Sequence, residues 1–356
     1  MNGTVTHFFG QAMTGQGMKH VYKELMNTEA DKVYLLKGAH GFKISKLFNE
    51  LTTHYSTQGA DVEIFLDPLF ENTIEALFVK EPYNILYLQG TNPSVEPILL
   101  GLRDKVISLY DCVDEQKLLL HSEQLAKIHE MKTIYYENCF ASLANAIKIH
   151  DDWEVETRRY MNWKGLDDQF DELKSTLLGN TKQEKAAKLT HRLLGTLTPK
   201  GARDTVQSIT QNLERRLFIK GYPGTGKSSM MKKLAEEATS RGYDVQMVWC
   251  GLDSNSVDMV IIPELKFCIF DSTEPHVYFP DEARLGDEIY DIAQHCHPTE
   301  VEERNIEKIV ANYKAAIKDA TMNANLYAIE ERKVREIIDQ SIYDEQFEKR
   351  VKMLFK

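Results

Sequence analysis

Residues 221–228 read Gly-Tyr-Pro-Gly-Thr-Gly-Lys-Ser, which fits the pattern G-x-x-x-x-G-K-[ST] of a phosphate-binding loop. Glycines let the backbone wrap closely around phosphate oxygens and present its N–H groups to them. Lys227 is placed to reach the β- and γ-phosphates of a nucleotide, and a serine at position 228 supplies a magnesium ligand. Because such a loop joins a strand to a helix, this segment predicts an α/β fold.

The segments on either side of the loop have the composition that this context requires. An apolar run at 217–219 precedes the loop and is typical of a buried parallel strand. Apolar residues recur at helical spacing after it, and Arg241-Gly242 then supplies a helix end. We therefore expect ATP and magnesium to bind through Gly221, Gly224, Thr225, Gly226, Lys227, Ser228 and Ser229.

A second short apolar run, at 267–270, is followed directly by Asp271. Four apolar residues and an aspartate downstream of a phosphate-binding loop resemble a Walker B strand, whose carboxylate holds magnesium or its water. A strand that ends in aspartate at a turn is also common. We predict Lys227 and Asp271 as the catalytic residues, and Ser228 and Asp271 as the magnesium ligands.

Four further polar residues lie near these elements. Asp253 and Asp258 follow an apolar run at 245–250, and Glu264 and His276 flank the strand that ends at Asp271. Ligands of open α/β sheets gather at the carboxyl ends of the strands, so Asp253 or Asp258 is a candidate base or magnesium contact. The same Asp-Ser-Asn composition is equally good turn chemistry, and the pattern assigns no reaction step to any of the four.

The chain also aligns with itself at an offset of 183 positions. Eight identities fall within a 26-residue window and cluster on loop glycines and element boundaries, which indicates a duplication. The identical pairs are Lys37/Lys220, Gly38/Gly221, Gly41/Gly224, Ser45/Ser228, Leu51/Leu234, Gly59/Gly242, Asp61/Asp244 and Val62/Val245.

The first copy lacks the residues that carry the chemistry. Ile44 stands where the second copy has Lys227, and Lys43 replaces the third glycine of the loop. At the offset of 183, Leu88 falls opposite Asp271, with Gln89 beside it, so the magnesium carboxylate is missing as well. These three losses predict a first copy that does not hydrolyse nucleotide.

The repeat predicts two tandem P-loop NTPase-like domains, each a mainly parallel sheet flanked by helices. We expect a degenerate domain at 1–161, a polar linker with some helix at 162–189, and an intact domain at 190–356. Each half ends in a long helical stretch. In the second half, apolar residues follow a seam-like rhythm of fours and threes, which fits packing on its own sheet or on the equivalent helix, or a partner surface: Ile306, Val310, Tyr313, Ile317, Ala320, Ala324 and Tyr327.

The composition limits the classes of partner. A formal charge of −11 makes nucleic acid an unfavourable partner, because phosphate backbones need a basic face. No apolar run approaches the roughly 18 residues of a membrane span. Five cysteines without paired spacing fit free thiols in a reducing cytoplasm, and His295-Cys296-His297 lacks a second ligand pair for zinc.

Taken together, these motifs resemble an uncharacterised family of bacterial two-domain P-loop ATPases. The likeness covers nearly the whole chain and implies a tandem P-loop fold that binds ATP, with no established substrate. Relatives tend to have intact loops in both halves, so Ile44 departs from the family pattern. The resemblance rests on 220–229, on Ile261-Ile262-Pro263-Glu264-Leu265, on Asp271-Ser272-Thr273 with Pro275-His276, and on His150-Asp151-Asp152-Trp153-Glu154.

The leading hypothesis is a magnesium-dependent ATPase whose turnover switches the arrangement of the two halves, of a homo-oligomer or of a protein partner. A small-molecule or nucleotide kinase would use Asp253 or Asp258 as a base toward an acceptor hydroxyl, and no arginine-rich lid is evident for it. A nucleotide sensor that does not catalyse is the third class. Guanine is disfavoured because the base-reading motif N-K-x-D does not occur.

Overall fold

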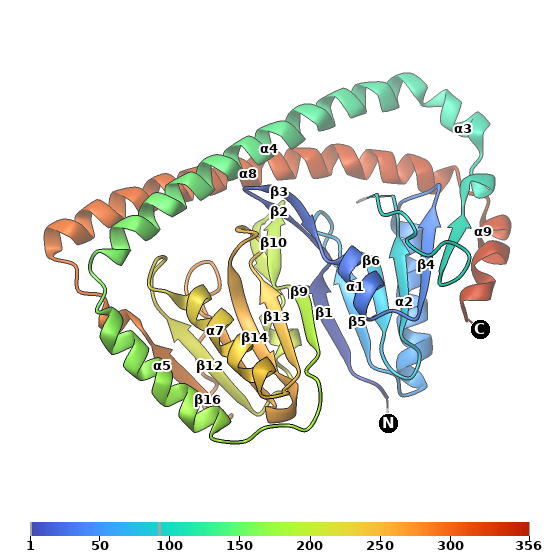
Figure 1. Cartoon of the computed structure of the whole chain (residues 1–356). Helices are drawn as coiled ribbons and strands as arrows, with labels where there is room; N and C mark the ends of the chain where they lie inside the picture. The colour runs from blue at the N-terminus through green and yellow to red at the C-terminus, as the bar shows by residue number, and fades with distance from the viewer. Residues whose placement is uncertain (1, 92–93, 356) are drawn as a thin grey trace.

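Short apolar runs form the strands of a large mixed sheet, and amphipathic segments form the helices that flank it (Figure 1). The computed structural model describes residues 2–91 and 94–355. The first half of the chain contains, in order, β1 (Val5–Phe9), β2 (Gln11–Thr14), β3 (Gly17–His20), α1 (Tyr22–Thr28), β4 (Lys32–Lys37), α2 (Phe42–Thr57), β5 (Val62–Leu66), β6 (Ile74–Val79), β7 (Ile85–Gln89), β8 (Asp104–Ser108), η1 (Tyr110–Cys112), α3 (Glu115–Leu120) and α4 (Ser122–Arg158).

The second half repeats this order of elements at the spacing of the sequence repeat. The strand before the 221–228 loop, for example, begins at residue 215, whereas the equivalent strand of the first half begins at residue 32. The elements are α5 (Trp163–Leu178), β9 (Leu189–Leu193), β10 (Gly195–Thr198), β11 (Gly201–Asp204), α6 (Val206–Ile209), β12 (Arg215–Lys220), α7 (Lys227–Ser240), β13 (Val245–Trp249), β14 (Val257–Ile262), η2 (Pro263–Leu265), β15 (Phe267–Asp271), β16 (Asp287–Asp291), η3 (Ala293–His295), α8 (Glu300–Gln340), α9 (Asp344–Val351) and η4 (Lys352–Phe355).

Twelve of the described strands form one sheet, in the order β16-β12-β15-β14-β13-β9-β1-β5-β6-β7-β4-β8. The two halves meet at the Phe9–Leu193 pair of β1 and β9. On either side of this junction the order is the same, so β12 in one half and β4 in the other each lie between two parallel neighbours. The loops that follow β12 and β4 therefore emerge at the carboxyl ends of parallel strands, where α/β folds bind ligands.

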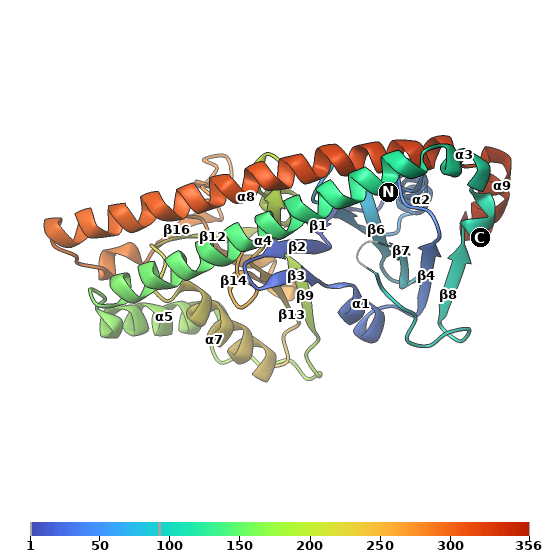
Figure 2. The same ribbon diagram turned by 90° about the horizontal axis from the view of Figure 1, so that it is seen from above.

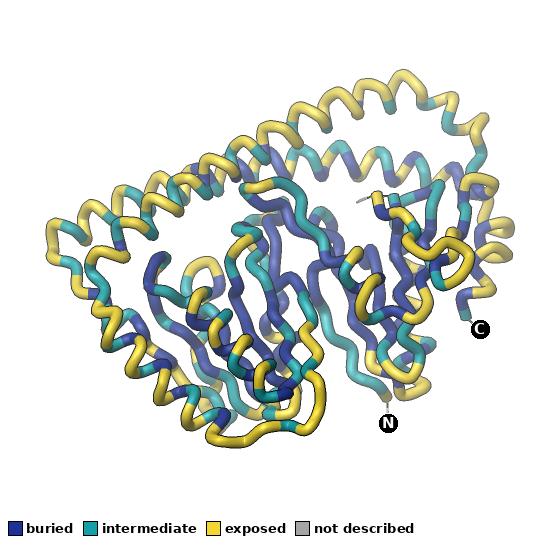
Figure 3. Tube along the Cα trace, in the orientation of Figure 1, coloured by how far each residue is buried: buried dark blue, intermediate teal, exposed yellow. Residues whose placement is uncertain are grey.

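The helices after these loops cover opposite faces of the sheet. The two views show α7 on one face, against β13 and β14, and α2 on the other face, against β5 and β6 (Figure 2). Each helix buries an apolar stripe and leaves its polar side in solvent (Figure 3). The two faces are thus covered by equivalent elements of the two halves.

The two long helices α4 and α8 pack on each other as an antiparallel pair that crosses both halves (Figure 2). Lys132 of α4 pairs with Glu331 of α8, and four residues later the Tyr136 ring lies 6.0 Å from the ring of Tyr327, which is four residues earlier in α8. The two helices therefore run in opposite directions. The expectation that the α8 seam packs against the equivalent helix of the other half is confirmed. In the described part of the chain, even these helices are not apolar enough to span a bilayer.

The terminal helices are exchanged between the halves. The segment 162–189 was expected to be a polar linker rather than part of a core, but its helix α5 buries Leu166, Phe170 and Leu173 in the hydrophobic cluster of the second half. In the same way, α9 and η4 bury side chains, including Phe347 and Leu354, in the cluster of the first half. Each half of the sheet is therefore completed by a helix from outside the range expected for that half. The expected ranges were 1–161 for the first half, which receives α9, and 190–356 for the second half, which receives α5.

Candidate functional site

The loop at 221–228 joins the buried strand β12 to the helix α7, as the sequence predicts. Gly224 and Gly226 have φ values of +84° and +91°, a left-handed conformation that glycine adopts without strain. Within the described residues, no group accepts a hydrogen bond from the N–H of Gly226 or of Lys227. The start of α7 therefore presents free donors and the positive end of a helix dipole, which together favour an anion.

Lys227 and Asp271 lie side by side because β15 is the parallel neighbour of β12, with Asp271 opposite Ile219. The Lys227 Nζ atom is 2.9 Å from Asp271 Oδ2 and donates to Gly221 O at 2.6 Å and to Thr273 Oγ1 at 2.8 Å. These contacts hold the ammonium group inside the loop.

The hydroxyl of Ser228 ties α7 to the neighbouring antiparallel strand. Its Oγ accepts a hydrogen bond of 2.9 Å from the backbone N–H of Val257. Ser45, at the equivalent position of the first half, accepts a bond of 2.8 Å from Ile74 N–H. This bond is therefore a structural feature of both halves, and it leaves a second lone pair of the Ser228 oxygen for a cation.

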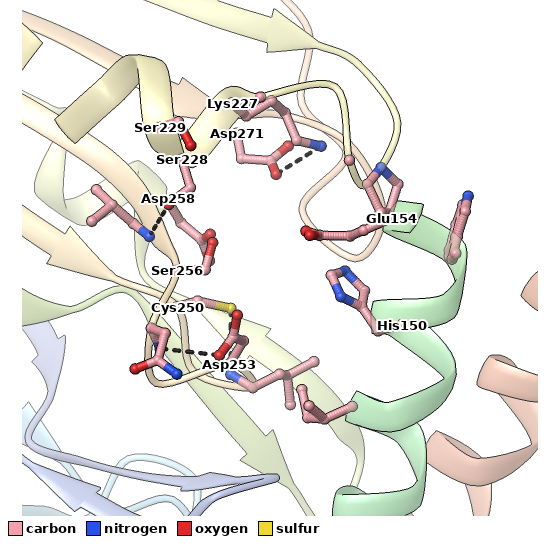
Figure 4. Close-up of a pocket in the computed structure, with 18 of the residues that line it drawn as sticks. His150, Glu154, Lys227, Ser228, Ser229, Cys250, Asp253, Ser256, Asp258 and Asp271 are labelled. Atoms are coloured by element: carbon pink, nitrogen blue, oxygen red, sulfur yellow. Dashed lines mark hydrogen bonds and ion pairs between the residues drawn. The ribbon is translucent and has the colours of Figure 1, made fainter. Parts of the chain in front are cut away.

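A cavity of about 250 Å³ opens at the end of this loop (Figure 4). One wall consists of residues from the loop and the start of α7, including Lys227, Ser228 and Ser229. The others are the β13–β14 connection, the segment after β15, and the long helices α4 and α8. The first half thus contributes a wall to a site that is centred on the second half.

Asp258, His276 and Asp204 form a buried chain of charged groups beside the cavity. His276 Nδ1 lies 2.7 Å from Asp204 Oδ2, and its Nε2 lies 3.8 Å from Asp258 Oδ2. Burial raises the pKa of Asp258 to about 6, although the charge of His276 acts against this. Burial also acts to lower the pKa of His276, but the hydrogen bond to Asp204 and the two carboxylate charges outweigh it, so the pKa of His276 is raised. An imidazolium between two carboxylates is the favoured form.

Helix α4 places His150, Trp153 and Glu154 at the cavity, and Figure 4 shows the side chains of His150 and Glu154 directed toward the loop. The backbone of α4 comes so close that a Cβ atom on Gly224 would lie 2.5 Å from the carbonyl oxygen of Glu154. Sequence reasoning did not assign these residues to the site, although their spacing of i, i+3 and i+4 places them on one helix face. The Nε1 donor of Trp153 is buried without a partner among the described residues.

Of the four other residues that the sequence singled out, the structure places three at the cavity and one away from it. Asp258 and His276 line the cavity with Asp271. Asp253 also lines it, but its Oδ1 accepts bonds from Asn255 N and Gln16 Nε2, which is the turn role that its sequence context allows. Glu264 is not at the site, since it pairs with Lys185 and accepts a bond from Asp244 N–H. The antiparallel strand β14 carries the chain from the cavity to the opposite edge of the sheet before Glu264 is reached.

The equivalent loop of the first half is filled by a protein carboxylate. Asp339, near the end of α8, accepts hydrogen bonds from Phe42 N–H at 2.9 Å and from Lys43 N–H at 3.5 Å. A Cβ atom on Gly41 would lie 2.4 Å from its Oδ1 atom. At the offset of the sequence repeat, Lys43 N–H faces Asp339 whereas its counterpart Gly226 N–H has no acceptor among the described residues, and Thr225 N–H, the counterpart of Phe42 N–H, donates to Tyr222 O within its own loop.

The strand pairing moves the first-half counterpart of Asp271 by one residue from the position that the sequence repeat predicts. Asp271 faces Ile219 across β12–β15, whereas Gln89 faces Leu36 across β4–β7. Gln89, rather than Leu88, is thus the counterpart of Asp271, because the connection before β15 is one residue shorter than that before β7. The first half still lacks a carboxylate at this position.

The residues at the second loop fit magnesium bound with a nucleotide better than magnesium bound alone. No cluster of three or more His, Cys, Asp or Glu side chains with metal-binding geometry occurs in the described ranges. Magnesium is usually held by one or two protein oxygens together with phosphates and water. Ser228 and Asp271 supply such oxygens at the cavity.

Comparisons of the chain with protein-family models, curated proteins and solved structures find no match. What this cavity does must therefore follow from the chemistry of its own side chains.

Proposed function

We propose that the chain is a tandem P-loop protein of the family it resembles, and that its second half binds ATP with magnesium and hydrolyses it. One contrast between the two loops supports this most directly. Asp339 accepts from the N–H groups of Phe42 and Lys43 at the start of α2, whereas the N–H groups of Gly226 and Lys227 have no acceptor among the described residues and lie beside the Lys227 ammonium group. A site with free donors and a cation in a glycine loop has the chemistry that a triphosphate requires.

Each side chain has a distinct role in this proposal. Lys227 exchanges its contact with Asp271 for oxygens of the β- and γ-phosphates, and the N–H groups of the loop hold the β-phosphate. Ser228 and Asp271 hold the magnesium ion, which when bound offsets charge on the phosphates. The α4 wall excludes bulk water and strengthens these interactions.

A phosphotransferase is the second candidate, and the extent of the cavity favours it. The cavity continues from Lys227 past Asp258 to Cys250, Leu252 and Asp253, which leaves room beyond the expected phosphates. A small acceptor with a hydroxyl group would occupy this part. Hydrolysis without any acceptor separates the two functions.

The test is phosphate release from ATP and GTP by the purified protein, with and without candidate hydroxyl acceptors. Lys227→Ala is expected to weaken ATP binding about 10- to 100-fold, which corresponds to the loss of one or two hydrogen bonds between charged groups. Lys43→Ala is the matched control, because Lys43 belongs to the loop of the first half and pairs with Asp344. Equal ATP affinity of the folded wild-type and Lys227→Ala proteins in calorimetry would refute the assignment of this loop.

A further inference from the structure

We infer that Asp258 is the general base of the second-half site, and that it takes the proton from the water molecule that attacks the γ-phosphate. The inference rests on the proposed function, since it needs a triphosphate on the 221–228 loop. It adds a catalytic residue that the loop motif does not contain, together with two residues that position it.

The placement of Asp258 is the first observation. The residue is the second of β14, an antiparallel strand that begins at the edge of the sheet where the phosphate-binding loop lies. Its neighbour Val257 donates to Ser228 Oγ at 2.9 Å, so the strand is fixed directly to the start of α7. Asp258 is only 5% exposed and lines the cavity together with Lys227 and Ser228.

The state of its carboxylate is the second observation. Asp258 Oδ2 is buried and has no hydrogen-bond partner among the described residues. Buried polar atoms are rarely left unpaired, because the lost hydration costs free energy. An acceptor without a partner that lines a cavity is suited to bind a water molecule or the hydroxyl group of a ligand.

The other carboxylates of the cavity have closer partners among the described residues, whereas the cation nearest to Asp258 Oδ2 is His276 Nε2 at 3.8 Å. Asp271 pairs with Lys227 and accepts two hydrogen bonds from Thr273. Glu154 pairs with Arg158, and Glu274 pairs with Lys314. Asp253 is held in its turn by Asn255 N–H, as described above.

His276 and Asp204 act as positioning residues for this base. His276 is 7% exposed and lies with Nε2 at 3.8 Å from Asp258 Oδ2, while its Nδ1 is held at 2.7 Å by Asp204. Asp204 is itself fixed by the hydroxyl of Tyr278 at 2.7 Å. At 3.8 Å the imidazole attracts Asp258 Oδ2 without a hydrogen bond to it, so it can orient the carboxylate while this oxygen keeps its capacity to accept one.

The first half has a carboxylate at the same strand position, but hydrogen bonds from neighbouring side chains already occupy it. Glu75 is the second residue of β6, as Asp258 is of β14. It is buried and accepts hydrogen bonds from Gln11 Nε2 and from the hydroxyl of Tyr22. The half with a filled loop thus has a satisfied carboxyl group, and the half with an open loop has an unsatisfied one.

In the proposed step, water attacks the γ-phosphate of ATP and Asp258 accepts its proton. The oxygen of water forms a bond to the γ-phosphorus while the bond from that phosphorus to the β,γ-bridging oxygen breaks, and the electron pair leaves with ADP. The proton of the water passes to Asp258 Oδ2 and is later lost to solvent. The products are ADP and inorganic phosphate.

Asp258→Asn tests the inference, because it keeps the shape of the side chain and removes the proton acceptor. We expect the kcat for ATP hydrolysis to fall about 100-fold or more, as is typical when a general base is lost, while the affinity for Mg-ATP stays within about threefold or increases. Glu75→Gln is the matched control in the first half and should leave kcat unchanged. Asp258→Glu should retain more of kcat than Asp258→Asn, since it keeps a carboxylate.

His276→Gln provides a second, independent variant if Asp258→Asn does not fold. It should lower kcat about tenfold with little change in the affinity for Mg-ATP, because a positioning residue acts on the reaction step. A kcat of Asp258→Asn within threefold of the wild type would overturn the inference. So would a loss that excess magnesium restores, since Asp258 would then be a metal ligand. Wild-type protein that binds no Mg-ATP would overturn the proposed function and this inference together.

Discussion

Lys227 makes three contacts within its own protein, with Gly221 O, Thr273 Oγ1 and Asp271 Oδ2. A buried ammonium group needs such partners, because an unpaired charge inside a protein is costly. On nucleotide binding these partners would be exchanged for phosphate oxygens, and the Asp271 carboxylate would be released for another cation. The ion pair thus holds both side chains in place before a ligand arrives.

Asp271→Asn is expected to spare nucleotide binding and to remove most magnesium-dependent turnover. The change deletes one negative charge next to the expected metal position, and a hard oxygen charge is what magnesium prefers. We expect kcat to fall at least about tenfold, measured as phosphate release over a range of magnesium concentrations. Asp253→Asn removes the same charge from a turn residue of the same cavity wall and serves as the control. Turnover at the wild-type level in Asp271→Asn would mean that the residue only ends a strand.

Part of this site could be predicted from the sequence, because its residues follow directly from local patterns. The loop motif and a strand that ends in aspartate were sufficient to bring Lys227, Ser228 and Asp271 into one prediction, and the structure places all three at one cavity. His150 and Glu154 could not be assigned, because they reach the site only through the path of a long helix from the other half. Helical periodicity defines a face, but it does not define what that face packs against.

At the scale of elements, the contact between α4 and the 221–228 loop depends on the absence of a side chain at Gly224. Its φ of +84° and the 2.5 Å approach of Glu154 O to an added Cβ atom act together. Gly224→Ala is therefore expected to lower the free energy of unfolding by about 1–3 kcal/mol and to weaken ATP binding, since α4 must move away from the loop. Denaturant unfolding and calorimetry measure the two effects.

Gly201→Ala is the control that separates backbone strain at a positive φ from the steric clash with α4. Gly201 has a φ of +107°, but nothing lies within 4 Å of an added Cβ atom. The Gly201→Ala protein should therefore lose stability only through the strained backbone conformation, and its ATP affinity should stay at the wild-type level. The contact between α4 and the loop would have no functional role if both variants kept the wild-type affinity.

A buried charge cluster fixes the pairing of α4 and α8 and makes it sensitive to acid. Burial acts to raise the pKa of Glu331, but His40, Arg335 and Lys132 outweigh it and hold that pKa well below its usual range. A carboxylate with a depressed pKa contributes stability above its ordinary value near 4.5, and this contribution is lost as the pH falls toward the lowered value.

Glu331→Gln is accordingly expected to cost about 3–5 kcal/mol at neutral pH, because it leaves Lys132 without its anion and Arg335 with Asp67 alone. The difference from the wild type should shrink as the pH falls below about 4, because the Glu331 carboxylate of the unfolded wild-type chain is protonated there while that of the folded chain stays ionised. Unfolding by denaturant between pH 3 and pH 7 measures it. A difference that stays constant over this range would show that the charge of Glu331 does not stabilise the fold.

For the whole molecule, the exchange of terminal helices explains why the predicted boundaries were incomplete. Leu166, Phe170 and Leu173 recur at spacings of four and three, which is a helical stripe, but the polar residues around them suggested a linker. Which core receives such a stripe is set by the tertiary arrangement. A fragment that begins at residue 190 would leave the second-half cluster without α5, so the role of the first half is better tested by substitution in the intact chain.

The filled loop of the first half leads to the last prediction, that one chain binds one ATP. Asp339 occupies the donors at the start of α2, where a phosphate would bind, and Ile44 replaces the lysine that would contact the phosphates. Asp339→Ala should therefore not create a second site, because the lysine and the third glycine of the loop would still be missing. It should instead lower the free energy of unfolding by about 0.5–2 kcal/mol, the usual effect of losing a side chain that caps a helix start. Calorimetric titration with Mg-ATP is expected to give a stoichiometry of one for the wild type and for Asp339→Ala, and an affinity about 10- to 100-fold lower for Lys227→Ala. Two ATP molecules per wild-type chain would show that the first loop opens in solution, and that α8 releases it when nucleotide is present.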